Sequence, residues 1–416
     1  MNHIYLDRVK IVRFMLKILA VFLILDGNSM YHSLAYQDLH FPWICVALIL
    51  VTTLFTGVTR GSKQVIIIAL MIFMYCLTYF IIQYESISKE VYICIIIGFP
   101  LLLIMFYNLR LMQMEYELFY CIEWVMLRLS VISLFFWLFG QISGLVHTNM
   151  SVVSNWGRIR TWEGYYGLHF ATNYSNSLGN GLPINSGLFS EGPMFCLWLC
   201  ISLATELFLR EKYSKPRVAL LIITIATTLS TTGVLFVALS FGLKYLEYMK
   251  GRVSIWKVVL TFLLILLLPV AVVALQQVIM LKMNTSSYSI RYRDYIAGYL
   301  LFREHPIFGS GYGNIMSLQK YVLLSTAGNV GFSNTVTAIL GTGGLWNFII
   351  YLASIVIPLG GRGKKDQHIK SFFILYTFLT VFVIFFSRLL MVVFFAFSFS
   401  QLNSLVNCSN SKISKY

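Results

Sequence analysis

Long apolar runs recur along this chain, separated by polar connections. Runs of about 20 apolar residues suit helices that cross a hydrocarbon layer, where each segment must satisfy its own backbone hydrogen bonds. The runs lack the alternating pattern of membrane-barrel strands. The pattern therefore predicts an all-α integral membrane protein, one polytopic domain over residues 1–416, with about twelve transmembrane helices. We expect these helices at 14–35, 41–58, 65–83, 91–109, 124–145, 188–209, 217–230, 232–246, 257–279, 333–358, 371–387 and 389–406.

Two connections are much longer than the rest, at about 146–187 and 280–332. Loops of such length are usually functional or disordered, and the many aromatic residues here favour function. The segments 217–246 and 371–406 are each interpreted as hairpins, the second turning at Ser387-Arg388. With this topology, roughly two thirds of the Lys and Arg residues lie in short connections on one side, so the positive-inside rule places both termini in the cytoplasm and both long loops outside.

Composition agrees with this picture. The chain is 58% hydrophobic and 11% charged, which excludes an ordinary soluble domain. The net charge of +15 follows from the topology and does not indicate a nucleic-acid surface. None of the seven cysteines lies in the long loops, and none pairs with a histidine at metal-binding spacing. We therefore expect no disulfide framework, no metal site and no cofactor.

The second long loop holds the first set of candidate residues. The helical spacing of apolar positions in residues 286–303 predicts an amphipathic helix that carries Arg291, Arg293 and Arg303. Asp294 lies one turn after Arg291 and could orient its guanidinium toward an anion. The alternative is an interfacial helix whose arginines meet lipid headgroups.

The segment after this helix contains His305, three alternating glycines at 309, 311 and 313, and Asn314. The glycines permit close approach of another group to the backbone. His305 could act as a general base, although an exposed histidine is more often simply solvated.

The first long loop holds Arg158 and Arg160 among tryptophans and tyrosines. Such a mixture suits sugar stacking with anion binding, and it equally suits an interfacial aromatic belt. Glu191 stands where the chain enters the next predicted helix. An ionisable group there is a candidate functional residue unless it remains at headgroup level.

Four motifs occur in an order that is typical of one superfamily. They are Gly187-Leu188-Phe189-Ser190-Glu191-Gly192-Pro193, then Ser230-Thr231-Thr232-Gly233, then His305-Pro306-Ile307-Phe308-Gly309-Ser310-Gly311-Tyr312-Gly313-Asn314, and Ser333-Asn334-Thr335 followed by Gly343-Gly344. Over about residues 150–350 the chain resembles the O-antigen and capsular polysaccharide polymerases (Wzy-like) and O-antigen ligases. The resemblance implies an architecture like that of GT-C-type glycosyltransferases.

The resemblance also implies a metal-independent glycosyltransferase of the bacterial cytoplasmic (inner) membrane. Such an enzyme joins undecaprenyl-pyrophosphate-linked oligosaccharide repeat units into O-antigen, capsular or exopolysaccharide chains. Arg291, with Arg158 or Arg160, would stabilise the pyrophosphate, while His305 or Glu191 would accept the proton of the attacking hydroxyl. Arg293, Arg303 and Asn314 complete the candidate substrate-binding set. Further candidate partners are membrane lipid, a chain-length regulator and a flippase.

This chain departs from relatives at several places, two of which bear on the choice between polymerase and ligase. Ligases usually carry a His-Asn pair where this chain has Ser333-Asn334, which disfavours the ligase alternative. The arginine-to-glycine spacing of some polymerases is absent, because His169 and Phe302 stand at the corresponding positions. A lipid-linked oligosaccharide flippase is the alternative from another class. It is disfavoured because the polar residues concentrate in the loops and not along the helix centres.

Overall fold

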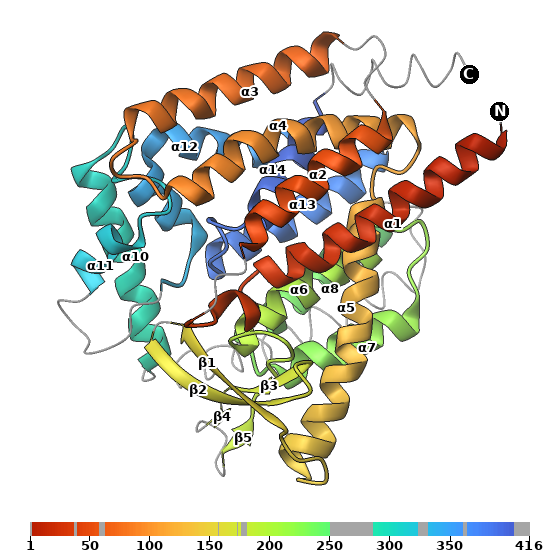
Figure 1. Cartoon of the computed structure of the whole chain (residues 1–416). Helices are drawn as coiled ribbons and strands as arrows, with labels where there is room; N and C mark the ends of the chain where they lie inside the picture. The colour runs from red at the N-terminus through yellow and green to blue at the C-terminus, as the bar shows by residue number, and fades with distance from the viewer. Residues whose placement is uncertain are drawn as a thin grey trace.

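A computed structural model describes residues 2–36, 40–57, 63–156, 158–172, 174–175, 181–249, 286–322, 332–360 and 364–402. This part of the chain is mostly helical (Figure 1). Its helices are α1 (Asn2–Asp26), α2 (Phe41–Thr56), α3 (Lys63–Ile82), α4 (Lys89–Leu111), α5 (Glu117–Phe135), α6 (Gly192–Ala204), α7 (Lys215–Thr227), α8 (Thr231–Met249), α10 (Ser286–Glu304), α11 (Ile315–Val322), α12 (Thr335–Leu359), α13 (Lys364–Phe382) and α14 (Leu389–Ser400). Short 3-10 or π segments are η1 (Tyr31–Ser33), η2 (Phe136–Ile142) and η4 (Thr205–Leu209).

The membrane-protein prediction is confirmed in its coarser form. Five helical stretches of the described chain are long and apolar enough to cross a membrane: Lys63–Ile82, Lys89–Leu111, Glu117–Ile142, Gly192–Leu209 and Thr335–Leu359. Two shorter apolar helices, α2 and α14, accompany them. The number of twelve spans stays a prediction, and the helix expected at 257–279 lies outside the described residues.

The first predicted helix, 14–35, is displaced. α1 begins at Asn2. Its first turns are polar, so an apolar run does not include them, but they continue the same helix. It ends at Asp26 because Asn28 takes a left-handed conformation (φ 65°), which stops an α-helix. Residues 27–36 are consequently available for a turn and η1 outside the helix.

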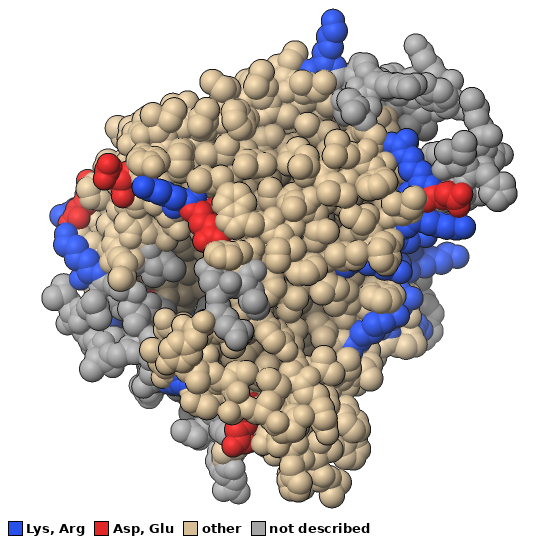
Figure 2. Space-filling view, viewed as in Figure 1, with Lys and Arg blue, Asp and Glu red and all other residues tan. Residues whose placement is uncertain are grey.

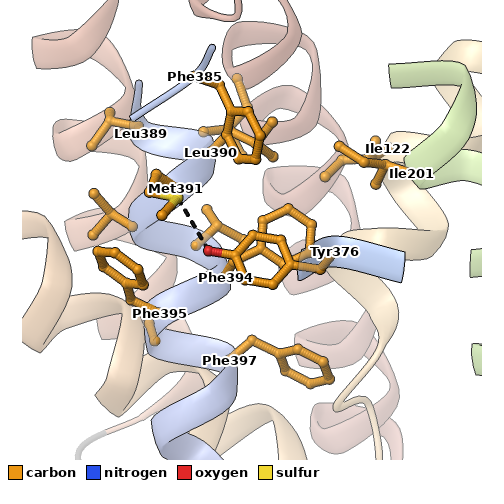
Figure 3. Close-up of a cluster of buried hydrophobic side chains, with 14 of the residues drawn as sticks. Ile122, Ile201, Tyr376, Phe385, Leu389, Leu390, Met391, Phe394, Phe395 and Phe397 are labelled. Carbon is orange, nitrogen blue, oxygen red and sulfur yellow. Dashed lines mark hydrogen bonds between the residues drawn. The ribbon is translucent and has the colours of Figure 1, made fainter. Parts of the chain in front are cut away.

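The apolar core surrounds α14. In Figure 3, Phe394 of α14 lies against Tyr376 of α13, with ring centroids 4.2 Å apart. The Tyr376 hydroxyl donates to the Met391 sulfur at 3.1 Å, so the one polar atom of that ring has a partner. All twelve residues of α14 except Phe399 are buried, which fits a central helix that is apolar on every side.

The first long loop, predicted only as a connection, folds as a small sheet beside the mostly helical remainder of the described chain. Strands β1 (Met150–Trp156), β2 (Arg158–Tyr165) and β3 (His169–Ala171) form an antiparallel sheet in that order, and β4 (Tyr174–Ser175) pairs with β5 (Leu182–Pro183). The loop is rich in aromatic and β-branched residues, which favour strands, but it lies between helices and was interpreted only as a connection. The backbone N–H of Ala35 donates to the Val153 carbonyl at 3.0 Å, so the sheet is fixed to the segment that follows η1.

The glycine-rich segment after α10 packs into a kink of α12. Gly344 has φ 61° and ψ −168°, which interrupts the helix and frees the next backbone N–H groups. Leu345 N–H donates to the Pro306 carbonyl at 2.9 Å, and Trp346 N–H donates to that of Ile307 at 3.0 Å. A Cβ atom on Gly309 would lie 2.3 Å from the Thr342 carbonyl oxygen. The close approach predicted from the glycines is therefore an approach to the protein's own backbone.

Lys and Arg residues gather at one end of the helix bundle, which we call the basic end (Figure 2). At the basic end, Arg8 of α1 donates to the Phe55 carbonyl of α2 at 2.8 Å, and Arg13 pairs with Glu117 of α5 at 2.5 Å. Figure 2 shows Lys and Arg gathered at the side where the N-terminus of α1 lies in Figure 1. The sheet lies at the opposite end of α1 (Figure 1). The orientation of this basic end toward the cytoplasm stays a prediction.

Candidate functional site

The connection between α13 and α14, which we call the 382–388 turn, joins segments that are far apart in the sequence. Arg291 of α10 donates from Nη1 to the Phe382 carbonyl at 3.3 Å. The Thr335 hydroxyl at the start of α12 donates to the Val383 carbonyl at 2.8 Å and accepts from Phe385 N–H at 3.0 Å. The Asn28 side-chain amide donates to the Ile384 carbonyl at 3.4 Å. The turn thus brings α10, α12 and the end of α1 to one place.

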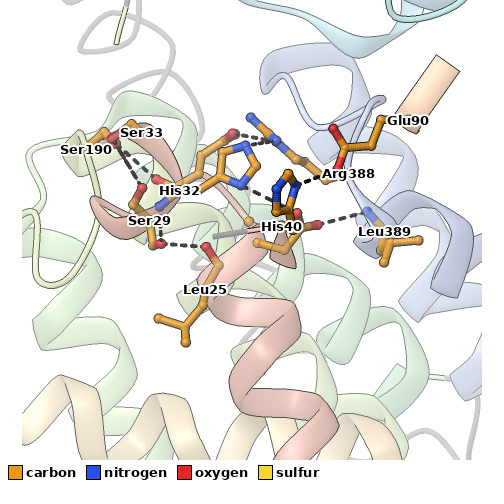
Figure 4. A network of polar contacts seen from close by, with 12 residues as sticks. Leu25, Ser29, His32, Ser33, His40, Glu90, Ser190, Arg388 and Leu389 are labelled. Carbon is orange, nitrogen blue, oxygen red and sulfur yellow. Dashed lines mark hydrogen bonds and ion pairs between the residues drawn. The ribbon is translucent and has the colours of Figure 1, made fainter. Parts of the chain in front are cut away.

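Arg388 belongs to this turn and forms the centre of a polar network (Figure 4). Its Nε donates to Asn28 Oδ1 at 2.7 Å, and its Nη1 lies in hydrogen-bonding contact with His32 Nε2. On the other side of the ring, His32 Nδ1 lies 3.6 Å from the Asp26 carboxylate, which accepts from Leu389 N–H at 3.2 Å. Because a guanidinium can only donate, we assign His32 Nε2 as the acceptor and place the ring proton on Nδ1, toward Asp26.

His32 is held as a neutral base in this arrangement. Burial lowers the pKa of His32 to about 3, and the positive charge of Arg388 acts in the same direction. Its side chain is 23% exposed, so a small part of the ring remains accessible. The ring therefore has an unprotonated nitrogen beside an arginine at the surface of the helix bundle.

Three helices begin near the 382–388 turn. α14 begins directly after Arg388, and α12 begins at Thr335, which is bonded to the turn. α6 begins after Glu191, and Met194 in its first turn contacts the side chain of Asn28. The N-terminal end of a helix carries a partial positive charge, so these three ends and the two arginines favour an anion here.

Asp294 lies beside Arg291 in the buried face of α10. Its side chain is fully buried, and the hydroxyl and backbone N–H of Ser333 lie near enough to its carboxylate to favour the charged form. Burial raises the pKa of Asp294 to about 6, while Ser333, Arg291 and Arg293 act in the opposite direction. The side-chain amide nitrogen of Asn334 is buried without a described partner. This donor has unused hydrogen-bonding capacity next to the candidate anion site.

We expect Asp294→Asn to raise the thermal stability at pH 7.5. A carboxyl with a folded pKa of about 6 and an ordinary unfolded pKa near 3.8 destabilises the fold as pH rises through that window, by roughly 3 kcal/mol once the pH is above it. Melting curves of the purified variant and wild type at pH 4.5 and 7.5 test this. The gain should shrink at pH 4.5, and the exposed variant Glu85→Gln should show no such pH-dependent gain. An unchanged or lower melting temperature for Asp294→Asn at pH 7.5 would contradict the assignment.

The sequence-predicted residues fall into three places. Glu191 is half-buried at the N-cap of α6 and directly follows Ser190, whose hydroxyl lies 2.8 Å from that of Ser33 (Figure 4). It therefore borders the Arg388 network. Arg291 lies at the 382–388 turn, and both Arg291 and Arg293 lie near enough to Asp294 to lower its pKa.

The residues at the other end of α10 lie apart from this cluster. His305 and Arg303 are exposed. At about 1.5 Å per residue, they lie roughly 20 Å from Arg291 along the helix. The Asn314 side chain donates to the Ser86 carbonyl at 3.1 Å and accepts from Ser317 N–H at 3.3 Å, so it fixes the loop before α11.

The arginines of the first loop lie on the sheet. Arg160 of β2 lies over the ring of Trp162, 5.6 Å from its centroid, as expected for a strand with alternating side chains. Arg158 begins β2, and its side chain lies outside the described residues. Both therefore stay predictions as ligands of the glycan carrier.

Sequence reasoning missed Asp26, Asn28, His32 and Arg388 as site residues. The available signal was an ionisable residue inside a predicted apolar run, which applies to Asp26, and an arginine at the tip of an apolar hairpin, which applies to Arg388. Within the described ranges, no group of three or more His, Cys, Asp or Glu side chains is suited to hold a metal ion.

Comparison with known proteins gives one finding about identity. Residues 217–352, roughly a third of the chain, match the sequence model of the O-antigen ligase family. The match includes Arg291 and the glycine-rich segment but not His32 or Arg388. No curated protein and no solved structure matches the chain. The similarity supports the O-antigen ligase and polymerase superfamily as a whole, without distinguishing its two reactions.

Proposed function

We propose that this protein is an oligosaccharide repeat-unit polymerase of the bacterial cytoplasmic membrane. Its substrate would be a glycan linked to undecaprenyl pyrophosphate, used at the outer face. The observation that carries this proposal is that Arg291 contacts one end of the 382–388 turn and Arg388 forms its other end, beside three helix N-terminal ends. Guanidinium groups bind phosphate oxygens in a bidentate manner, so this arrangement suits a pyrophosphate.

In the proposed reaction, a hydroxyl oxygen of the acceptor sugar attacks the anomeric carbon of the donor glycan. The new glycosidic bond forms as the bond from that carbon to the pyrophosphate oxygen breaks. The leaving pyrophosphate retains the electron pair, and Arg291 and Arg388 stabilise its added negative charge. A base must accept the proton of the attacking hydroxyl.

We propose that His32 Nε2 is the base that accepts this proton. In the described arrangement this nitrogen accepts from Arg388. A pyrophosphate that bound Arg388 would withdraw the guanidinium and free the nitrogen. It would also relieve the repulsion by Arg388, which is the smaller of the two causes that lower the His32 pKa, after burial. Asp26, on the Nδ1 side, would then stabilise the imidazolium that forms.

His32→Asn should lower the rate of glycan coupling by about a hundredfold, because a positioned base contributes at least this much. The acid limb of the pH–rate profile should also disappear, which a purely structural effect would not cause. The measurement uses purified protein with lipid-linked repeat units at several pH values. Glu191→Gln is the matched comparison. If that variant loses the acid limb while His32→Asn keeps it, the base is Glu191.

The second candidate function is O-antigen ligase, which fits the family match equally well. A ligase moves a completed chain onto a different acceptor, so the two reactions leave different products. Deleting the gene and separating the surface glycans on a gel distinguishes them. A ladder that collapses to one repeat unit supports the polymerase, whereas long chains that remain on the carrier lipid support the ligase. Loss of all external repeat units would instead indicate a flippase.

A further inference from the structure

A groove runs between α5 and α7, far from the 382–388 turn in the sequence and near the basic end. It has a volume of about 550 Å³ and opens on the side of the helix bundle. Its walls are apolar except at two positions. The lining residues are Leu127, Arg128, Val131, Ile132, Pro216, Arg217 and Leu220.

Arg128 is an exposed arginine within a helical stretch that is apolar enough to cross a membrane. Its guanidinium lies over the Trp124 ring, 3.3 Å from the centroid, and Nη1 donates to the Trp124 carbonyl at 2.9 Å. Trp124 precedes Arg128 by one turn, so the charge is directed back along α5 toward Glu117 and the basic end. This direction is typical of an arginine that reaches from an apolar helix toward the headgroup layer.

Arg217, at the other side of the groove, is only loosely paired. Arg210 lies closer to the two neighbouring carboxylates, at 2.8 Å from Glu123 and 2.9 Å from Glu206. Arg217 lies 3.9 Å and 3.6 Å from the same carboxylates and is 45% exposed. Among the described contacts, Arg217 donates no hydrogen bond and Arg128 donates one, although each guanidinium carries five N–H donors.

We propose that this groove binds an acidic phospholipid. Its phosphate would lie between Arg128 and Arg217, and its acyl chain would lie along Leu127, Val131 and Leu220. The apolar walls match an acyl chain. The free donors match phosphate oxygens, and an acidic lipid adds the net negative charge that a zwitterionic lipid lacks. Because Arg128 reaches back toward the N-terminal end of α5 and Arg217 lies in the first turn of α7, the predicted topology places the site in the inner leaflet.

Native mass spectrometry of the purified full-length protein tests this proposal. Phosphatidylglycerol and phosphatidylcholine with the same acyl chains are added in separate titrations. We expect phosphatidylglycerol to bind more tightly, and Arg128→Gln and Arg217→Gln each to weaken it about fivefold. Lys212→Gln removes one charge from the same connection without touching the groove, and it should leave the binding unchanged.

A second variant separates the groove from general surface charge. Leu220→Trp keeps every charge but fills the apolar part, so it should also weaken phosphatidylglycerol binding. The proposal is overturned if the two lipids bind equally, if Lys212→Gln has the same effect as the arginine variants, or if Leu220→Trp has none. Appearance of a dimer that both arginine variants abolish would assign the groove to a second copy of the chain instead. Melting temperatures in phosphatidylcholine confirm that each variant is folded.

Discussion

Arg291→Ala is expected to abolish long-chain polysaccharide while single repeat units remain on the carrier lipid. The guanidinium is fixed by the Phe382 carbonyl at 3.3 Å, so its direction is set before substrate arrives. Removing a prepositioned donor that stabilises charge in a transition state typically costs about 10²–10³-fold in rate. The surface glycans of cells that carry only the variant gene, separated on a gel, give the result.

Arg303→Ala provides the control for Arg291. It removes the same side chain from the same helix, but from an exposed position at its other end. We expect its glycan ladder to be normal. A normal ladder for Arg291→Ala would refute the proposed role, whereas Arg291→Lys should give a weak ladder because it keeps the charge and loses the planar fork.

Arg388→Gln should have a similarly large effect, a loss of about 10²–10³-fold in coupling rate. Glutamine retains an amide donor for Asn28 but has no positive charge for the leaving pyrophosphate. The rate at which purified protein consumes lipid-linked repeat units measures the effect. Because Arg388 contacts Asn28 and His32 in the resting arrangement, the melting temperature must be compared as well, and Arg388→Lys serves as a second variant with the charge retained.

The double variant Arg291→Ala with Arg388→Gln tests whether both residues act on one group. If both stabilise the same pyrophosphate, the combined loss should be clearly smaller than the product of the two single losses. Fully multiplicative losses would show that the two arginines act independently, and the shared anion site would then be wrong.

The Arg388 variants also test the proposed catalytic site independently of the family resemblance. Arg388 and His32 lie outside the matched residues 217–352, whereas Arg291 lies inside them. If Arg291 variants are inactive and Arg388 variants are fully active, the superfamily assignment stands and the site proposed here is wrong. If neither arginine matters, the glycosyltransferase proposal itself fails.

The glycine-rich segment shows that a sequence pattern can predict a close contact without identifying the partner in that contact. The three alternating glycines predicted that some group would approach the backbone closely, and that group is another part of the backbone. The contact is made with α12 at Gly344 and with Ser86, where a Cβ atom on Gly311 would lie 2.2 Å from the carbonyl oxygen. Spacing along the chain indicated that something must approach, but it could not indicate that the partner was 35 residues downstream or more than 200 upstream.

The sequence alone determined that this protein lies in a membrane and that its main elements are helices. The reason is that the length and hydropathy of each apolar run are local properties that lipid constrains directly. It also identified Arg291 and Glu191 as residues of interest. The tertiary structure alone brought Asp26, His32 and Arg388 together, at sequence separations of more than 350 residues between the first two and the last. It also placed His305 away from them. Apolar periodicity reports which side of a helix avoids water, but which helix ends meet depends on how all the helices pack, and packing is a property of the whole chain.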